Sequence, residues 1–308
     1  MRVLFYGTPP FALPTLEALL ASHEVVGVVT QPDRPAGRGQ RLTPPPVKER
    51  AIAAAVPVLQ PPRLGDPGWL EPLRAFGADL AVVVAFGQIL PKAVLDVPAR
   101  GSINVHASLL PKYRGAAPIA WALIRGESET GITTFQMDEG MDTGPILLSE
   151  RTAIRPGETA GELGARLARL GARVLIDTLA RLDTIVPTPQ QHGDATLAPR
   201  LRKTEGHLDW REPARALVNR IHGCNPRPGA LTRASGGRLT IWRARAVARS
   251  AGDIAPGTLI AGAGGVCIAA GDGAVEPIEV QPENRRVVAW PAYLRGARLR
   301  AGDRLGPA

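Results

Sequence analysis

Apolar positions at the start of the chain follow the order strand, helix, strand. Residues 2–6 and 25–30 are short apolar runs, which predict strands, and residues 11–20 carry apolar side chains at helical spacing, which predicts a helix. This order is typical of the opening unit of a doubly wound parallel sheet. No Gly-x-Gly-x-x-Gly follows the first run, so the pattern argues against a dinucleotide site.

The middle of the chain continues the same pattern. Residues 79–85 form a continuous apolar run, which suits a central parallel strand covered on both faces. Residues 102–106 alternate and therefore predict a strand, residues 131–137 predict another, and residues 159–182 predict a long amphipathic helix. The predicted fold class is α/β, with a Rossmann-like, doubly wound and mostly parallel sheet.

The last third shows a different pattern, with short strands separated by glycine. The predicted strands are residues 230–233, 239–247, 257–260, 266–270 and 275–280. Short strands at this spacing predict a small OB-like β-barrel. Residues 187–203, rich in Pro and Gln, are the best boundary. We therefore expect a catalytic domain at 1–188, a linker at 189–206 and a C-terminal domain at 207–308.

Candidate chemistry gathers at the end of the alternating run. Alternation places Ser102, Asn104 and His106 on one face, at the carboxyl end of a strand, where ligands bind in open parallel sheets. The acidic, Gly-rich turn at 138–144 could return Asp142 to this pair. An Asn, a His and an Asp at one point suit acyl transfer to an amine.

In that chemistry the Asn and His stabilise the oxyanion of a tetrahedral intermediate, and the Asp orients or charges the imidazole and helps take the proton of the amine. A structural alternative stays open on spacing alone. In it, Asn104 and His106 close a buried hydrogen-bond network and Asp142 caps a turn.

Two motifs carry a family resemblance. Residues 104–119, NVHASLLPKYRGAAPI, resemble the signature of formyltransferases that use 10-formyltetrahydrofolate, and residues 137–144, MDEGMDTG, resemble the second motif of that family. The resemblance implies a catalytic set of Asn104, His106 and Asp142. We expect no metal, because no metal ligands with plausible spacing appear and the chemistry needs none. It also implies folate contacts from Phe86, Gly87, Gln88, Ile89, Leu90, Ser108, Leu109, Leu110, Pro111 and Asp138. Gly87 would let the backbone approach a flat ring closely.

Charge divides unevenly along the chain. Residues 1–190 contain 19 Lys+Arg and 18 Asp+Glu, whereas residues 191–308 contain 18 and 10. A basic lobe beside a near-neutral one predicts a polyanionic partner held by the smaller domain. A generally Arg-rich proteome is the alternative, but such a bias should affect both parts of the chain.

A long Pro/Gly-rich loop is predicted at residues 31–47. Its Arg34, Arg38 and Arg41, with Gly hinges, are what a flexible arm that binds phosphates would need. A solvated surface loop is the alternative.

The resemblance covers nearly the whole chain and, with the basic last third, implies a family member that acts on methionyl initiator tRNA. A member acting on a sugar-nucleotide or purine-precursor amine is the alternative, but it would not need a basic surface. Cys224 and Cys267 lack metal-site spacing and suggest a reducing compartment. The first strand begins at once, and no apolar run reaches eighteen residues. We expect a cytoplasmic enzyme without a signal peptide, a membrane span or a stable protein partner.

Overall fold

A computed structural model of the chain describes residues 1–37, 39–234, 237–248, 254–262 and 264–306. The chain forms two compact units. Unit 1 contains Met1–Pro118, Thr130–Thr152 and Gly164–Pro199, and unit 2 contains Ile119–Glu129, Ala153–Leu163 and Arg200–Ala308. The change of unit at Pro199 lies inside the predicted linker, but unit 2 also takes two segments from the first half of the chain. The domain limits 1–188 and 207–308 stay a prediction.

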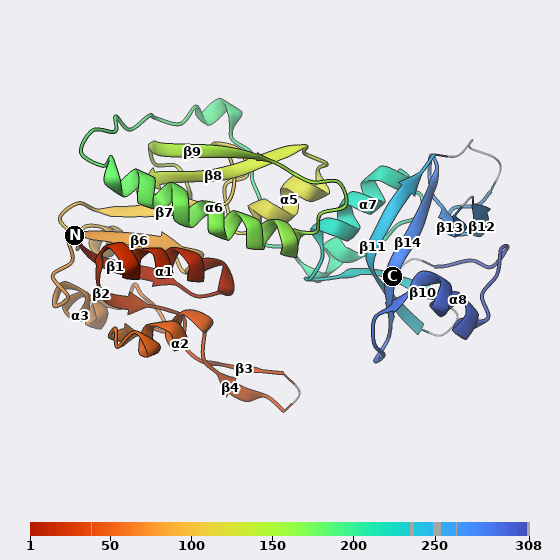
Figure 1. Ribbon diagram of the computed structural model, residues 1–308, viewed down its shortest axis with the longest axis horizontal. Helices are drawn as coiled ribbons and strands as arrows, with labels where there is room; N and C mark the ends of the chain where they lie inside the picture. The colour runs from red at the N-terminus through yellow and green to blue at the C-terminus, as the bar shows by residue number, and fades with distance from the viewer. Residues whose placement is uncertain (38, 235–236, 249–253, 263, 307–308) are drawn as a thin grey trace. The chain divides into compact units, whose positions relative to one another are not determined.

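Unit 1 is built on a seven-stranded sheet in the order β5-β2-β1-β6-β7-β8-β9 (Figure 1). Its strands are β1 (Arg2–Gly7), β2 (Glu24–Val29), β5 (Val58–Leu59), β6 (Leu80–Val84), β7 (Ser102–His106), β8 (Glu129–Gln136) and β9 (Ile146–Ala153). The strands from β5 to β7 are parallel, and β8 runs antiparallel to β7. The predicted doubly wound, mostly parallel sheet is confirmed.

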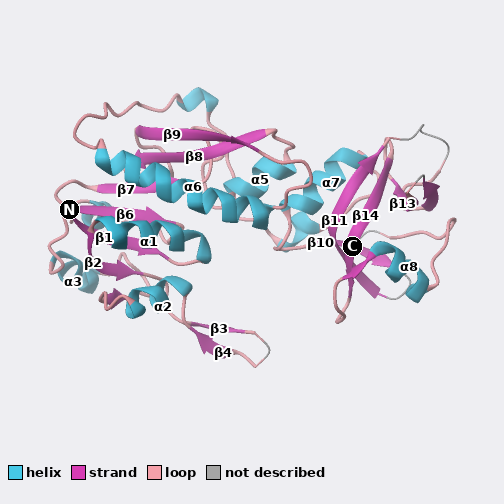
Figure 2. Ribbon diagram, in the orientation of Figure 1, coloured by secondary structure: helices cyan, strands magenta, loops and turns pink. Residues whose placement is uncertain are grey.

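Burial explains the position of β6 at the centre of this sheet. All five of its residues, LAVVV, are buried, as expected for a parallel strand covered on both faces. The helical elements of the first half are η1 (Pro10–Ala12), α1 (Leu13–Ser22), α2 (Pro46–Ala53), η2 (Pro67–Trp69), α3 (Leu70–Arg74), α4 (Lys92–Leu95) and α5 (Pro118–Ile124). They are followed by α6 (Ala160–Ala180) and η3 (His192–Asp194). Figure 2 shows helices of unit 1 lying beside its sheet, with β8 and β9 next to each other at one edge.

The predicted loop at residues 31–47 contains a hairpin, which corrects the sequence-based expectation. β3 (Arg34–Ala36) pairs antiparallel with β4 (Arg41–Thr43), and Figure 1 shows the pair extending away from the sheet of unit 1. The turn uses left-handed backbone at Gly37 (φ 69°) and Gln40 (φ 51°). The predicted contact residue Arg38 lies outside the described residues.

Unit 2 is antiparallel, in the order β10-β11-β14-β13-β12 with β15 beside β14. Its elements are η4 (Lys203–Gly206), α7 (Ala214–Gly223), β10 (Ala230–Ala234), β11 (Gly237–Val247), β12 (Leu259–Gly262), β13 (Gly265–Ala269), β14 (Ala274–Pro282), β15 (Val288–Ala289) and α8 (Trp290–Ala297). The end of the chain joins the two outer strands, because Arg304 bridges Thr258 beside β12 and Gly306 bridges Arg233 in β10. This closure confirms the predicted barrel.

Candidate active site

The carboxyl ends of β1, β2 and β6 are joined at one edge of the sheet. The Thr8 hydroxyl, just after β1, donates to the carbonyl of Phe86 after β6 (2.9 Å) and accepts from the N–H of Gln31 after β2 (3.4 Å). β7 pairs with β6 in parallel, so its last residue, His106, belongs to the same edge. Ligands bind at such edges in open α/β sheets.

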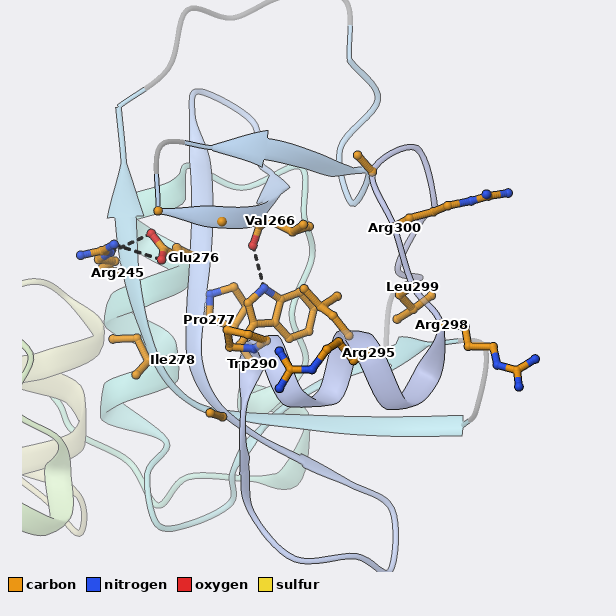
Figure 3. Close-up of a pocket in the computed structure, with 16 residues that line it drawn as sticks. Arg245, Val266, Glu276, Pro277, Ile278, Trp290, Arg295, Arg298, Leu299 and Arg300 are labelled. Atoms are coloured by element: carbon orange, nitrogen blue, oxygen red, sulfur yellow. Dashed lines mark hydrogen bonds and ion pairs between the residues drawn. The ribbon is translucent and has the colours of Figure 1, made fainter.

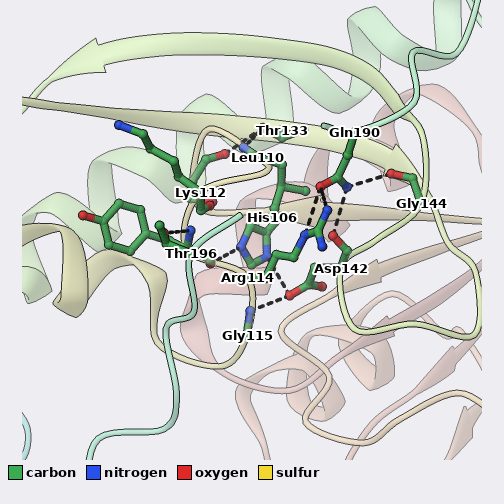
Figure 4. A network of polar contacts seen from close by, with 12 residues as sticks. His106, Leu110, Lys112, Arg114, Gly115, Thr133, Asp142, Gly144, Gln190 and Thr196 are labelled. Carbon is green, nitrogen blue, oxygen red and sulfur yellow. Dashed lines mark hydrogen bonds and ion pairs between the residues drawn. The ribbon is translucent and has the colours of Figure 1, made fainter. Parts of the chain in front are cut away.

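His106 and Asp142 meet at this edge (Figure 4). The His106 Nε2 lies 2.9 Å from the carbonyl oxygen of Tyr113, which can only accept, so Nε2 carries the hydrogen. The other ring nitrogen, Nδ1, lies 3.6 Å from the Asp142 Oδ2. Both side chains are largely buried, with 7% and 16% of their surface exposed. Nδ1 is therefore the nitrogen that can take up a proton, and the carboxylate lies where it would meet that proton.

Asn104 shares a face of β7 with His106, because side chains two residues apart in a strand point the same way. Its backbone lies between those of Val83 in β6 and Phe135 in β8. Within the described residues the side-chain amide of Asn104 makes no hydrogen bond. Asn104 therefore takes no part in a closed buried network, and its N–H groups can serve a ligand.

The turn that holds Asp142 depends on glycine and on Asp138. Asp142 has left-handed backbone (φ 55°), and a Cβ on Gly144 would lie 1.8 Å from the carbonyl oxygen of Gln136. The Asp138 Oδ1 accepts from the hydroxyl of Thr143 (2.6 Å) and the N–H of Gly140 (3.0 Å). Asp138, a predicted folate contact, thus closes the turn and stays exposed.

Residues 108–111, also predicted folate contacts, form a loop tied to β8. The Thr133 hydroxyl donates to the Ser108 carbonyl (2.7 Å) and accepts from the Leu110 N–H (3.1 Å). The Ser108 hydroxyl donates to the Lys112 carbonyl (2.6 Å). Leu110 is buried, whereas Leu109 and Pro111 are partly exposed. The loop is thus fixed before any ligand arrives.

The predicted folate loop at 86–90 divides into structural and accessible residues. Phe86 and Leu90 are buried in the core of unit 1, so only their backbone is available to a ligand. The Gln88 side chain accepts from the Leu64 N–H (2.8 Å) and donates to the Pro61 carbonyl (2.9 Å). Two residues face open space. Ile89 is 86% exposed, and a Cβ on Gly87 (φ 87°) would meet nothing within 4 Å.

Two further residues of the site were missed from the sequence. Arg114 and Gln190 are each 6% exposed, and their side chains bond to each other beside Asp142 (Figure 4). Arg114 lies inside the first motif, which could have drawn attention to it. Gln190 lies in the predicted linker, where the surrounding Pro and Gln residues give no signal of burial.

A separate cavity of about 870 Å³ lies in unit 2 beside α8 (Figure 3). The indole N–H of Trp290 donates to the Val266 carbonyl (2.6 Å) on its wall, and Arg245 pairs with Glu276 at its rim. Figure 3 shows the side chains of Arg298 and Arg300 pointing away from it. The cavity holds none of the predicted catalytic residues.

Within the described residues, no group of three or more His, Cys, Asp or Glu side chains is arranged to hold a metal ion. Across the same residues, no helix combines the length and the apolar character needed to cross a membrane.

Comparison with known proteins identifies the family. Residues 1–179 match the formyl transferase family, and residues 200–298 match the formyl transferase C-terminal domain. The chain is 50% identical over 309 residues to the methionyl-tRNA formyltransferase of Solibacter usitatus, with 99% of each chain covered. It is 47% identical to that of Sorangium cellulosum, with 99% of this chain and 100% of the relative covered.

Solved structures share the fold. One is the N-formyltransferase from Helicobacter canadensis in complex with folinic acid and dTDP-3-aminofucose (TM-score 0.66, 18% identity, 90% of this chain and 98% of that one). Another is HypX from Aquifex aeolicus in complex with tetrahydrofolic acid (TM-score 0.63, 17% identity, 98% of this chain and 48% of that one). The chain belongs to the formyl transferase family and, within it, to the methionyl-tRNA formyltransferases.

Proposed function

We propose that this chain transfers the formyl group of 10-formyltetrahydrofolate to the free amino group of methionyl initiator tRNA, giving the formylmethionyl-tRNA used in translation initiation. The observation that carries the proposal is the pairing of His106 and Asp142 beside the free amide of Asn104, in a chain half identical to methionyl-tRNA formyltransferases over its whole length.

The roles follow from the chemistry of these groups. The methionyl amine attacks the formyl carbonyl carbon of the folate, and the tetrahedral intermediate then breaks its bond to the folate nitrogen. That nitrogen leaves as part of tetrahydrofolate and takes a proton in exchange for the one that the amine loses. The N–H groups of Asn104 can donate to the carbonyl oxygen as it gains charge. Nδ1 of His106 can take up a proton of the amine, and Asp142 stabilises the ring that results. No metal has a part in this proposal.

The open surface beside the pair suits the folate. Gly87 and Ile89 face open space after β6, so a flat ring could lie against the backbone there. The names of two structural neighbours, which record bound folinic acid and tetrahydrofolic acid, support a folate ligand for this fold. The residues assigned to folate remain part of the proposal.

The same proposal includes a tRNA as the partner and the cytoplasm as the location of the enzyme. Residues 191–308 carry 18 Lys+Arg against 10 Asp+Glu, which suits a phosphate-rich partner. A sugar-nucleotide amine would not need such a surface. We propose that the enzyme acts in the cytoplasm.

Formyl transfer from 10-formyltetrahydrofolate to charged initiator tRNA, with and without His106→Ala, tests the proposal. We expect the wild type to be active and His106→Ala to lower kcat by at least about a hundredfold, the scale of losing an acid–base or oxyanion group. His207→Ala, at an exposed histidine of unit 2, is the control. A folded His106→Ala variant with near-normal kcat would remove His106 from the mechanism, and an inactive wild type would refute the function.

A further inference from the structure

We propose that Tyr113, Arg114, Gly115 and Gln190 form a clamp that positions Asp142 against His106, and that Gln190 is its central positioning residue. None of the four is assigned a role in the transfer chemistry above. The kinetic test of this inference rests on the proposed function, but the test by the His106 ring resonances does not.

Three consecutive residues contact the His106–Asp142 pair or its support. The Tyr113 carbonyl accepts from His106 Nε2 (2.9 Å), which fixes the ring on one side. The Gly115 N–H donates to Asp142 Oδ2 (2.7 Å), the oxygen that faces His106 Nδ1. The side chain of Arg114, between them, bonds to Gln190 instead of either catalytic side chain.

Gln190 connects this segment to the turn that holds Asp142. Its Oε1 accepts from Arg114 Nε (3.1 Å) and Nη2 (2.6 Å). Its Nε2 donates to the carbonyls of Asp142 (2.9 Å) and Gly144 (2.7 Å). Both hydrogens of the amide and its oxygen are therefore used, so the side chain has one possible orientation.

Burial and strain explain why the turn needs this support. Asp142 has φ 55°, a strained conformation that a residue other than glycine keeps only where its surroundings hold it. Gln190 bonds the carbonyl of that same residue. A shift of about 1 Å in a catalytic group can lower a rate about a hundredfold. The two amide hydrogens of Gln190 are thus placed to control the distance between His106 and Asp142.

Gln190→Glu tests the donors selectively. A carboxylate keeps the shape, and one of its oxygens still accepts from Arg114, but the oxygen that replaces Nε2 faces the carbonyls of Asp142 and Gly144 and cannot donate to them. We expect kcat to fall about tenfold or more, while the KM for 10-formyltetrahydrofolate stays near the wild-type value. Gln191→Glu makes the same change at the exposed neighbour and should leave kcat unchanged.

A double-mutant cycle with Asp142→Asn distinguishes positioning from general support. If Gln190 acts through Asp142, Gln190→Glu should change kcat little once Asp142 has been replaced. Equal fold-changes in both backgrounds, or a parallel loss of kcat, folate affinity and thermal stability in Gln190→Glu, would refute the clamp.

A measurement without substrate separates this inference from the proposed function. The ring ¹⁵N resonances of His106, one of five histidines, can be assigned with His106→Ala. Gln190→Glu should shift them in the same direction as Asp142→Asn, and Gln191→Glu should not. Unshifted resonances in Gln190→Glu would overturn the clamp, whereas absence of transfer by the wild type would overturn only the proposed function.

Discussion

Two buried histidines show how contacts decide what a residue does. His106 and His222 are each 7% exposed. His106 faces a carbonyl on one side and a carboxylate on the other. His222 instead accepts weakly from the Ala244 N–H (3.5 Å), and burial, followed by the nearby Arg243, lowers its pKa. The surroundings of His106 suit proton transfer, whereas those of His222 keep its ring neutral.

His222 should make stability depend on pH. In the unfolded chain it takes up a proton below about pH 6.5, but in the folded chain it resists protonation, so the free energy of unfolding should decrease as pH falls below that value. One proton limits the slope to about 1.4 kcal/mol per pH unit. His222→Gln should flatten the slope just below about pH 6.5, measured by denaturant unfolding.

The other charges around His222 leave that window clear. A hydrogen bond from Arg243 lowers the pKa of Glu162 to about 2, so Glu162 stays charged throughout, as do Arg243 and Arg215. His207→Gln, at an exposed histidine, should leave the slope as in the wild type. Equal slopes in the wild type and His222→Gln would show that His222 does not cause the effect.

At the scale of elements, the β3–β4 hairpin joins a fixed base to exposed arginines. Lys48 Nζ donates to both Asp33 oxygens (2.8 and 2.7 Å), and Gln60 donates to one of them (2.7 Å). The hydrogen bond from Gln60, followed by that from Lys48, lowers the Asp33 pKa. Arg34 is tied to Gln31 at this base (3.0 Å). These contacts fix the base from which the hairpin extends.

Among the described residues of this hairpin, Arg41 is the one that we expect to contact tRNA. It is exposed, and its side chain has no partner among the described residues. Arg41→Ala should lower kcat/KM for charged initiator tRNA. It should also reduce the slope of log(kcat/KM) against log salt concentration by about the amount that one phosphate contact contributes. Folate affinity should stay unchanged. In the control Arg181→Ala, at another exposed arginine of unit 1, kcat/KM for the tRNA and its salt dependence should both match the wild type. A joint loss of folate and tRNA affinity would assign Arg41 to the folate site or to the fold.

At the scale of the whole molecule, the positive charge of unit 2 is partly neutralised. Arg211, Arg238 and Arg245 pair with Asp209, Glu283 and Glu276. Three arginines at and just after the end of α8 are exposed, and their guanidinium groups have no acidic partner among the described residues: Arg295, Arg298 and Arg300. Guanidinium groups without partners are the ones that can release counterions from a phosphate backbone.

Two triple variants with the same loss of charge test this distinction. Replacing Arg295, Arg298 and Arg300 by Gln should weaken tRNA binding. The slope of the log binding constant against log salt concentration should fall by up to about the amount that three phosphate contacts contribute. The same change at Arg211, Arg238 and Arg245 should have a smaller effect. Equal losses in tRNA binding assays would mean that net charge alone attracts tRNA. Deleting residues 204–308 is a poorer test, because unit 2 also includes Ile119–Glu129 and Ala153–Leu163.

Local patterns were enough to predict most elements. Apolar runs and alternation predicted β1, β2, β6, β7 and the barrel strands, because each strand buries its own residues in the pattern that its sheet imposes. The hairpin β3–β4 and the short β15 were missed. β3 and β4 contain Arg or Pro, the residues of β4 are exposed, and β15 has only two residues, both exposed, so none of the three strands carries an apolar period.

What the sequence determined by itself was the order of elements, the family and three candidate catalytic residues, since these depend on neighbours in the chain. Only the tertiary structure decided that Gln190, from the predicted linker, bonds the backbone of Asp142, 48 residues away. It also decided that Phe86 and Leu90 pack in the core while Ile89 faces open space. Contacts between distant segments follow from how the sheet folds, and a hydrogen-bonding side chain such as that of Gln190 looks the same in a sequence whether it is buried or exposed.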